Sequence, residues 1–487
     1  MRMRERAFEI AGVALGVVAL ALSWSASSLY GLGIDADGVW NLSAGVSLVE
    51  GRGLVTCRDE PFTLWPPLYP LVMAALEFAR VDVLAGLRVL HLVALAATLA
   101  LSARLAFVLS GSRWAVLATL GSLALSSRVH EFTIQVLSET FFVPLVLGAV
   151  VAARAWFESP TRSRWVALVA LSALACLQRY VGVAVVLTVG GALLCAGPGG
   201  LGSRALRATH YAAASVAPLL AWFARNYRIE GAFTGGRDAA IEPSEAIASD
   251  TLSTLARWIV PDGAPQWVAA VLYALAAVLV ARGLLDPQRR RDWALSASTA
   301  GVYLVLVVAM ATAVRVDRIA DRLLYPALPL LVALVWASCF RAVSSPRVLA
   351  AFVIVALASW SAGALRLVGH YERWRSDGAG TLHTRLWQEH ALTHDLRRLS
   401  IRGPCWSNAP ELVWMLQRIP VRFLAPGSRA WTRAGEQAAL SGGSLAWFQQ
   451  DGKPKGALPE LARLARTSPL AAVEDGLLLR LHPADER

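Results

Sequence analysis

The sequence predicts a mainly helical membrane protein that crosses the bilayer many times and ends in a small α/β domain. Of its 487 residues, 56% are hydrophobic and only 16% are charged, whereas soluble domains carry about 25% charged residues. Apolar runs of about 20 residues, long enough to cross the hydrocarbon core, recur up to position 370. A soluble helix needs a polar face, so these unbroken runs exclude a soluble helical bundle.

We expect about eleven transmembrane helices, all within residues 1–370. The first apolar run is too long for a secretory signal and lacks a cleavage site of small residues, which favours an uncleaved helix. The predicted spans are 8–31, 83–108, 114–126, 133–152, 165–177, 182–195, 209–224, 267–280, 293–314, 323–339 and 348–369.

The arginines predict the orientation of these spans. Lys453 and Lys455 are the only lysines among 46 basic residues, and arginines such as those at 289–291 are denser in alternate loops. By the positive-inside rule the N-terminus is then cytoplasmic, and an odd number of spans places residues 371–487 outside. The net charge of +12 is therefore mainly a topology signal. No exposed basic run is interleaved with aromatic residues, so we expect no nucleic-acid partner.

The first outer loop, 32–82, begins with two carboxylates, Asp35 and Asp37. Apolar residues follow at helical spacing over 38–50, which predicts a helix lying along the membrane interface. Each aspartate has an alternative role as the N-cap of that helix. Farther along, Trp65 and Tyr69 lie in a proline-rich run over 61–70 that predicts a rigid turn before a second interfacial helix near 71–80. This turn is either an aromatic anchor or a wall of a substrate site.

Further charged side chains are predicted at the same membrane face, at the outer ends of the spans. Arginine binds phosphate oxygens in a planar fork, and a carboxylate beside it can remove a proton from an acceptor. Transfer from a phosphorylated lipid needs this combination, although local Asp–Arg pairs and helix capping at Glu139 are alternatives. The carboxylates are Asp35, Asp37, Glu139, Asp317 and Asp321, and the guanidiniums are those of Arg179, Arg225, Arg237, Arg318 and Arg322.

Taken together, these segments resemble the C-type (GT-C) membrane glycosyltransferases, especially bacterial relatives of protein O-mannosyltransferase and aminoarabinose transferase. The resemblance covers nearly the whole chain in order. Two departures are Trp40, near a position where relatives often have tyrosine, and Tyr325, which is displaced within its motif. The matching motifs are Asp37 followed by Glu50-Gly51-Arg52-Gly53, the run 61–70, Ser138-Glu139, Arg179-Tyr180-Val181-Gly182, Trp222 to Tyr227 with Arg225-Asn226, Arg322 to Pro326, and Cys405 to Glu411.

The resemblance implies an inverting glycosyltransferase that uses a polyprenyl-phosphate-linked sugar at the outer face of the bacterial cytoplasmic membrane. The acceptor is a lipid, a glycan or a protein. We expect Asp37 as the base, with Asp35 as its rival and Glu139 as a third catalytic candidate. No cofactor is expected, and a divalent metal stays open. The expected substrate-binding residues are Arg179, Tyr180, Arg225, Asn226, Arg237, Arg318, Arg322, Trp65 and Tyr69. The alternatives are a lipid-linked glycan flippase and a non-catalytic glycan-binding scaffold.

Short alternating runs predict a small α/β layer in residues 371–487, with strands at 404–406, 420–424, 444–448 and 476–481. His383, His390 and His394 share one face of a predicted helix, where a solvated surface is the ordinary expectation and a metal site the alternative. Cys57 and Cys405 are both predicted outside, either as free thiols or as a disulfide.

Overall fold

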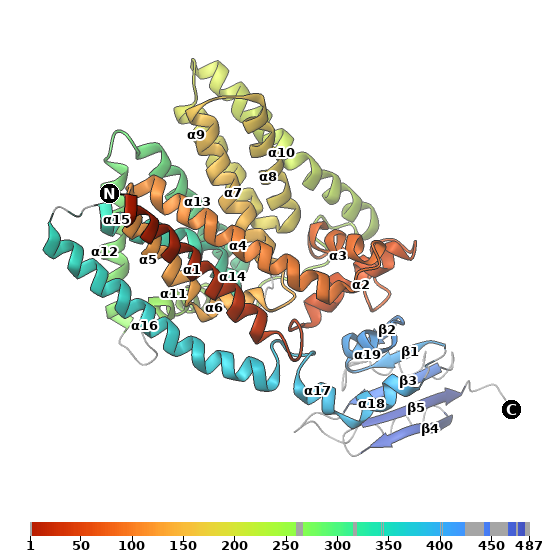
Figure 1. Cartoon of the computed structure of the whole chain (residues 1–487). Coiled ribbons are helices and arrows are strands. Elements are labelled where there is room, and N and C mark those ends of the chain that lie inside the picture. The colour runs from red at the N-terminus through yellow and green to blue at the C-terminus, as the bar shows by residue number, and fades with distance from the viewer. Residues whose placement is uncertain are drawn as a thin grey trace. The chain divides into compact units, whose positions relative to one another are not determined.

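The computed structural model describes residues 2–259, 266–314, 319–341, 343, 345–399, 401, 403–423, 443–448, 466–473 and 476–482 (Figure 1). The chain divides into two compact units. The first contains residues 1–28, 63–69 and 87–374, and the second contains 29–62, 70–86 and 375–487. The second unit thus combines most of the loop between the first two predicted spans with the C-terminal segment.

The first unit is helical. Each of the eleven predicted spans falls on a helix, since an apolar run of this length satisfies its backbone only as a helix in lipid. The helices, with two short 3₁₀ turns η1 and η2, are α1 (Arg2–Ala26), α4 (Val83–Ser110), α5 (Arg113–Ala124), α6 (Ser127–Thr133), α7 (Glu139–Glu158), α8 (Arg162–Gln178), η1 (Tyr180–Gly182), α9 (Val183–Ala196), α10 (Leu201–Glu230), α11 (Ser244–Ile259), α12 (Gln266–Leu284), α13 (Arg290–Ala313), α14 (Asp321–Leu324), η2 (Tyr325–Ala327), α15 (Leu328–Arg341) and α16 (Pro346–Asp377).

Within the described residues, seven segments are helical, long and apolar enough to cross a membrane. They confirm the predicted class of a polytopic helical membrane protein. The remaining predicted spans fall on α5, α8, α9 and α10, of which the first three are shorter and α10 carries more charge. The seven segments are Arg6–Ala26, Val83–Ser110, Glu139–Glu158, Trp267–Leu284, Arg290–Ala313, Asp321–Arg341 and Pro346–Asp377.

Several helices begin or end some residues away from the predicted boundaries, and the differences at the first and fourth spans bear on the site. The first span was expected to continue to residue 31, but α1 ends at Ala26. The fourth was expected to start at 133, whereas α7 starts at Glu139, because the apolar residues before it belong to the separate helix α6 and a linker. Glu139 is therefore the first residue of its helix, and the first turn of a helix favours negative charge.

The second unit contains α2 (Ala36–Val49) and all but the first two residues of α3 (Leu68–Phe78), both from the loop between the first two predicted spans. Helix α3 begins three residues earlier than expected, inside the proline-rich run. Pro70 is tolerated there because the first turn of a helix does not use its backbone N–H. The two helices pack closely at Gly45, where a Cβ atom would lie 2.8 Å from the carbonyl oxygen of Pro70.

The C-terminal segment adds α17 (Arg385–Glu389), α18 (Ala391–Arg398) and α19 (Pro410–Gln417) to a five-stranded sheet with the order β2-β1-β3-β5-β4. All four predicted strands are present, and β1 pairs in parallel with β2 and β3. The fifth strand, β4, was missed because Pro469 interrupts its sequence pattern. It is an edge strand with an irregularity after Pro469, the kind of position where a sheet accepts proline. The strands are β1 (Cys405–Ser407), β2 (Val421–Phe423), β3 (Gly443–Phe448), β4 (Arg466–Val473) and β5 (Gly476–His482).

The histidines and cysteines of this unit have structural roles. His383 lies outside any helix and is hydrogen-bonded to Leu32, while His390 precedes α18 and accepts from its backbone. The expected single helical face of three histidines is therefore wrong.

Cys57 and Cys405 are free and buried, and desolvation raises the pKa of each thiol to about 12. Both thiols are therefore protonated and unreactive at neutral pH.

Candidate active site

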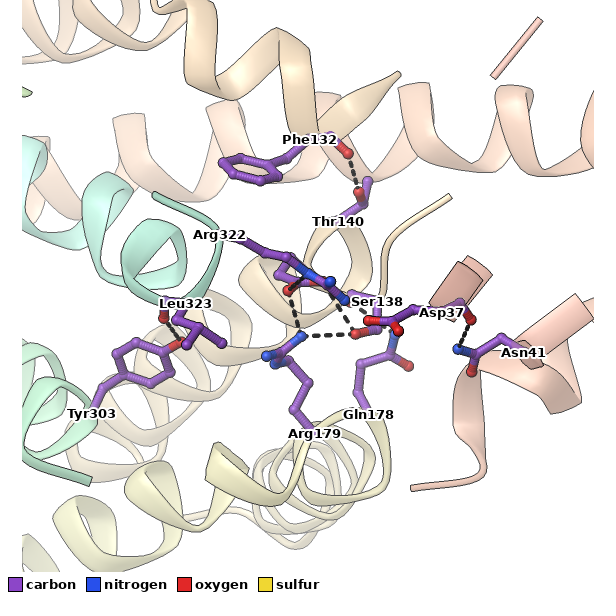
Figure 2. Close-up of polar contacts among 11 residues, drawn as sticks. Asp37, Asn41, Phe132, Ser138, Thr140, Gln178, Arg179, Tyr303, Arg322 and Leu323 are labelled. Atoms are coloured by element: carbon purple, nitrogen blue, oxygen red, sulfur yellow. Dashed lines mark hydrogen bonds and ion pairs between the residues drawn. The ribbon is translucent and has the colours of Figure 1, made fainter. Parts of the chain in front are cut away.

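A fully buried carboxylate, Glu139, pairs with two arginines from distant parts of the first unit. Figure 2 labels these arginines, Arg179 and Arg322. The Oε1 atom of Glu139 is 2.6 Å from Nη1 of Arg179 and accepts a hydrogen bond of 2.9 Å from Nε of Arg322. Nη1 of Arg179 also donates to the hydroxyl of Ser138 at 2.9 Å. We call Glu139, Arg179, Arg322 and Ser138 the Glu139 cluster. The alternative of local Asp–Arg pairs does not apply to Arg179 and Arg322, which pair with Glu139 across the fold.

Arg179 is placed by a break between two helices. Its backbone is extended between the end of α8 and the turn η1. The turn packs tightly on α8 because Gly182 has no side chain: a Cβ atom there would lie 2.4 Å from the carbonyl carbon of Ala175. The glycine of the Arg-Tyr-x-Gly motif thus allows the close approach that directs Arg179 toward Glu139.

Arg322 and its neighbour Asp321 lie on the short helix α14 and have different partners. Asp321 pairs with Arg128 at 2.9 Å and accepts a hydrogen bond of 2.7 Å from the indole of Trp258. The helix is also held by the hydroxyl of Tyr303, which donates to the carbonyl of Leu323 at 2.7 Å. Anchoring Asp321 and Leu323 in this way fixes the residue between them, Arg322.

Within the Glu139 cluster, two guanidiniums accompany one carboxylate. The arginine side chains remain 15% and 26% exposed, while Glu139 is inaccessible. Among the residues that the structure describes, the Arg179 side chain contacts Glu139 and Ser138 through Nη1. A guanidinium has five N–H donors, so its other N–H groups can donate to an anion.

Gln178 is a further polar residue of this region, and it was not among the residues predicted from the sequence. Its amide nitrogen donates to the carbonyl of Ser138 at 2.9 Å, which fixes the orientation of the amide because a carbonyl can only accept. Its Oε1 atom is buried and has no hydrogen-bond partner among the described residues. Leaving a buried acceptor without a partner costs free energy, so a ligand that donates a hydrogen bond to this atom would be favoured. A glutamine at the end of an apolar helix gives no such signal in the sequence.

A second group of predicted residues binds the proline-rich run instead. The carbonyl of Thr63 accepts from Nδ2 of Asn226 at 3.0 Å and from the hydroxyl of Tyr180 at 3.2 Å. The carbonyl of Leu64 accepts from Nη2 of Arg237 at 2.6 Å. We call these residues and the 63–64 peptide the turn network. The glycine Gly231, with φ of 71°, ends α10 and allows the chain to return toward the turn.

The turn network continues through side chains of α10. The indole of Trp222 donates to the hydroxyl of Tyr180 at 3.2 Å, and Arg225 donates to Oδ1 of Asn226 at 3.0 Å while lying over the Trp222 ring. Thr63 donates to Glu230 at 2.8 Å. The motif Trp-x-x-Arg-Asn-Tyr therefore supports the turn that carries Trp65, which is itself partly buried.

Tyr69 is separate from both groups. It is 1% exposed, its hydroxyl is hydrogen-bonded to Nε2 of His91 at 3.1 Å, and its ring packs against Phe141. His91 is in turn hydrogen-bonded to the carbonyl of Thr133 at 2.8 Å. These contacts are those of a buried polar link between α3, α4 and α6.

Asp35 and Asp37 belong to the second unit, at the start of α2. Asp35 occupies the N-cap position but makes no capping bond, and its Oδ1 atom instead accepts from the hydroxyl of Thr381 at 2.8 Å. Asp37 is the second residue of the helix, and its carbonyl accepts from Nδ2 of Asn41 at 2.7 Å (Figure 2). Asp35 therefore occupies the N-cap position of α2, but its side chain does not cap the helix.

Asp317 and Arg318 lie outside the described residues. No group of three or more His, Cys, Asp or Glu side chains that could hold a metal ion occurs in the described part of the chain.

Comparison with known proteins gives a match by structure alone. No protein-family model matches the chain, and no curated protein matches it by sequence. ArnT from Cupriavidus metallidurans, solved with undecaprenyl phosphate bound, is similar over 96% of this chain and 97% of its own, with a TM-score of 0.64 and 11% identity.

Two other solved structures are similar over most of this chain. Arabinofuranosyltransferase AftD from Mycobacteria matches 98% of it with a TM-score of 0.54 and 14% identity, over 40% of the AftD chain. The Archaeoglobus fulgidus oligosaccharyltransferase, tethered to an acceptor peptide, matches 90% of it with a TM-score of 0.54 and 11% identity, over 69% of its own chain. The expected resemblance is confirmed at the level of the fold: this chain shares the fold of ArnT, AftD and the oligosaccharyltransferase.

Proposed function

We propose that this protein is an inverting glycosyltransferase of the bacterial cytoplasmic membrane. It takes a sugar from a polyprenyl-phosphate-linked donor and transfers it to a lipid, glycan or protein acceptor on the outer face. The observation that carries the proposal is the buried Glu139 held between Arg179 and Arg322. The fold shared with ArnT and the undecaprenyl phosphate bound to ArnT support it.

The donor phosphate is assigned to Arg179 and Arg322. Glu139 holds both guanidiniums in place before the donor arrives, and their N–H groups bind the phosphate. Charge-assisted hydrogen bonds from preorganised donors are strongest where water is excluded. The same donors then stabilise the negative charge that develops on the departing phosphate.

Gln178 supports the assignment of a sugar to this site. Its unpartnered Oε1 can only accept a hydrogen bond, and an ionised phosphate has no hydrogen to donate. A sugar hydroxyl or amine has one. We therefore assign Gln178 to recognition of a donor group on the sugar, next to the phosphate held by Arg179.

Asp37 is assigned as the catalytic base. The acceptor hydroxyl oxygen forms a bond to the anomeric carbon, the bond from that carbon to the phosphate oxygen breaks, and the hydroxyl proton passes to Asp37. The electron pair of the broken bond leaves with the lipid phosphate. Attack from the face opposite the leaving group inverts the configuration. Thr381 donates a hydrogen bond to Asp35, and the spacing of Asp37 from Glu50-Gly51 in the family motif favours Asp37 as the base.

A gene deletion, complemented with variants, tests this proposal. Mass spectrometry of lipids and glycans from the deletion strain identifies the donor that accumulates and the acceptor that stays unmodified. Transfer by the purified enzyme should then fall at least about 100-fold in Asp37→Asn, because general-base catalysis is typically worth 10²–10⁴-fold. Asp35→Asn is the matched control and should cost less. Turnover near that of the wild type in Asp37→Asn would overturn the assignment.

A further inference from the structure

The C-terminal segment of the second unit contacts the chain directly before α2. Ile34 and Gly380 form a parallel bridge, and the amides of Thr381 and Leu382 donate to the carbonyl of Ile34 at 3.4 and 2.9 Å. Farther along this segment, Nδ1 of His383 is hydrogen-bonded to the carbonyl of Leu32 at 3.0 Å. Residues 379–383 therefore bend around residues 32–35 and contact them through an isolated bridge and several hydrogen bonds.

Glycines make this contact one of backbone against backbone. A Cβ atom on Gly33 would lie 2.3 Å from the carbonyl carbon of Ala379. Gly380 has a φ of 73°, and a Cβ atom there would lie 2.7 Å from the nitrogen of Ile34. A side chain at either position would force the two segments apart. Ile34 itself is completely buried.

The same segment holds the helix that carries Asp37. The hydroxyl of Thr381 donates to Asp35 at 2.8 Å, one residue before α2 begins. With Ile34 and Asp35 both held, the direction in which α2 starts is fixed, and Asp37 is its second residue.

A second contact holds α2 one turn later. The indole of Trp40 donates to Oε1 of Glu411 on α19 at 2.8 Å, and Arg58 forms an ion pair with the same oxygen at 2.7 Å. The Arg58 guanidinium also lies 4.5 Å from the Trp40 ring and 4.7 Å from the Phe423 ring. Glu411 is only 7% exposed, so removing one of its partners would leave a buried charge poorly compensated, which is strongly unfavourable.

We propose that the C-terminal segment is a clamp on α2 that positions the catalytic base. Gly380 and Thr381 are positioning residues that act at the start of α2. Glu411 is a third positioning residue, which acts on α2 through its hydrogen bond from Trp40. The inference rests on the proposed role of Asp37 and adds to it. It gives the outer α/β layer a part in catalysis in addition to any binding of acceptor.

The test compares Gly380→Ala and Thr381→Val in the purified full-length enzyme, with a polyprenyl-lipid extract of the native membranes as donor. A displaced catalytic group can cost about 100-fold, so Gly380→Ala should lower kcat on that scale, with the KM for donor little changed. Thr381→Val should lower kcat by roughly 2- to 12-fold, the value of one hydrogen bond, and Thr381→Ser should restore it. Gly369→Ala is the matched control, because no atom lies within 4 Å of its added Cβ.

Two further measurements separate the outcomes. Binding of undecaprenyl phosphate should be the same in all these variants, and its parallel loss with kcat would show general disruption and overturn the clamp. Asp37→Asn is assayed beside them. If Asp37→Asn is inactive while Gly380→Ala and Thr381→Val keep the wild-type kcat, the clamp is wrong and the proposed function stands. If Asp37→Asn is active, the proposed base is wrong.

Discussion

The Glu139 cluster and the turn network use the same kinds of side chain for different ends. Both contain arginines and polar residues at the outer ends of predicted spans. In the cluster, Arg179 and Arg322 are bound to the carboxylate of Glu139. In the turn network, Arg237, Tyr180 and Asn226 bind main-chain carbonyls of Thr63 and Leu64.

We infer from this difference that the cluster binds the substrate, whereas the turn network supports the loop. A guanidinium on a buried carboxylate keeps its charge in place and can bind an anion with its remaining donors. A guanidinium or amide on a backbone carbonyl fixes a loop. Adjacent motif residues divide between these roles, since Arg179 belongs to the cluster and Tyr180 to the turn network. A motif therefore does not assign one role to all its polar residues.

The largest effect is expected on removing the shared carboxylate. Glu139→Ala leaves two guanidiniums without their buried partner and should lower the free energy of unfolding by roughly 3–5 kcal/mol. The measurement is thermal unfolding of the purified protein in detergent. Glu230→Ala, at an exposed residue of the turn network, is the control and should change stability little. A loss below about 1 kcal/mol in Glu139→Ala, typical of a surface pair, would contradict this account of the cluster.

A smaller and different effect is expected in the turn network. Asn226 is completely buried, and Asn226→Ala removes its bonds to the carbonyls of Thr63 and Phe233. Leaving such groups unpaired should cost roughly 1–3 kcal/mol, again measured by thermal unfolding, while undecaprenyl phosphate still binds. Arg228→Ala, at an exposed position of the same helix, is the control. A selective loss of phosphate binding with unchanged stability would move Asn226 from support to substrate binding.

Local features of the fold were predictable from the sequence, and long-range pairing was not. Hydropathy located the helices, because each span must satisfy its own backbone in lipid. The sequence also named Glu139, Arg179 and Arg322 as candidates from their depth. It could not pair them, since Glu139 and Arg322 are 183 residues apart and Asp321 was the nearer partner. The contact between Ile34 and Gly380 was hidden for the same reason, and glycines gave no sign of it.

The central claim is that the Glu139 cluster binds the phosphate of a polyprenyl lipid, and a binding titration tests it most directly. Undecaprenyl phosphate is titrated into the purified wild type and into Arg179→Lys, Arg322→Lys and Arg237→Lys. Replacing the planar fork by a point charge at Arg179 or Arg322 should lose a charge-assisted hydrogen bond worth roughly 1.5–3 kcal/mol, or about 10- to 150-fold in affinity. Arg237→Lys should bind as the wild type does. Wild-type affinity in both cluster variants, or an equal loss in Arg237→Lys, would contradict the claim.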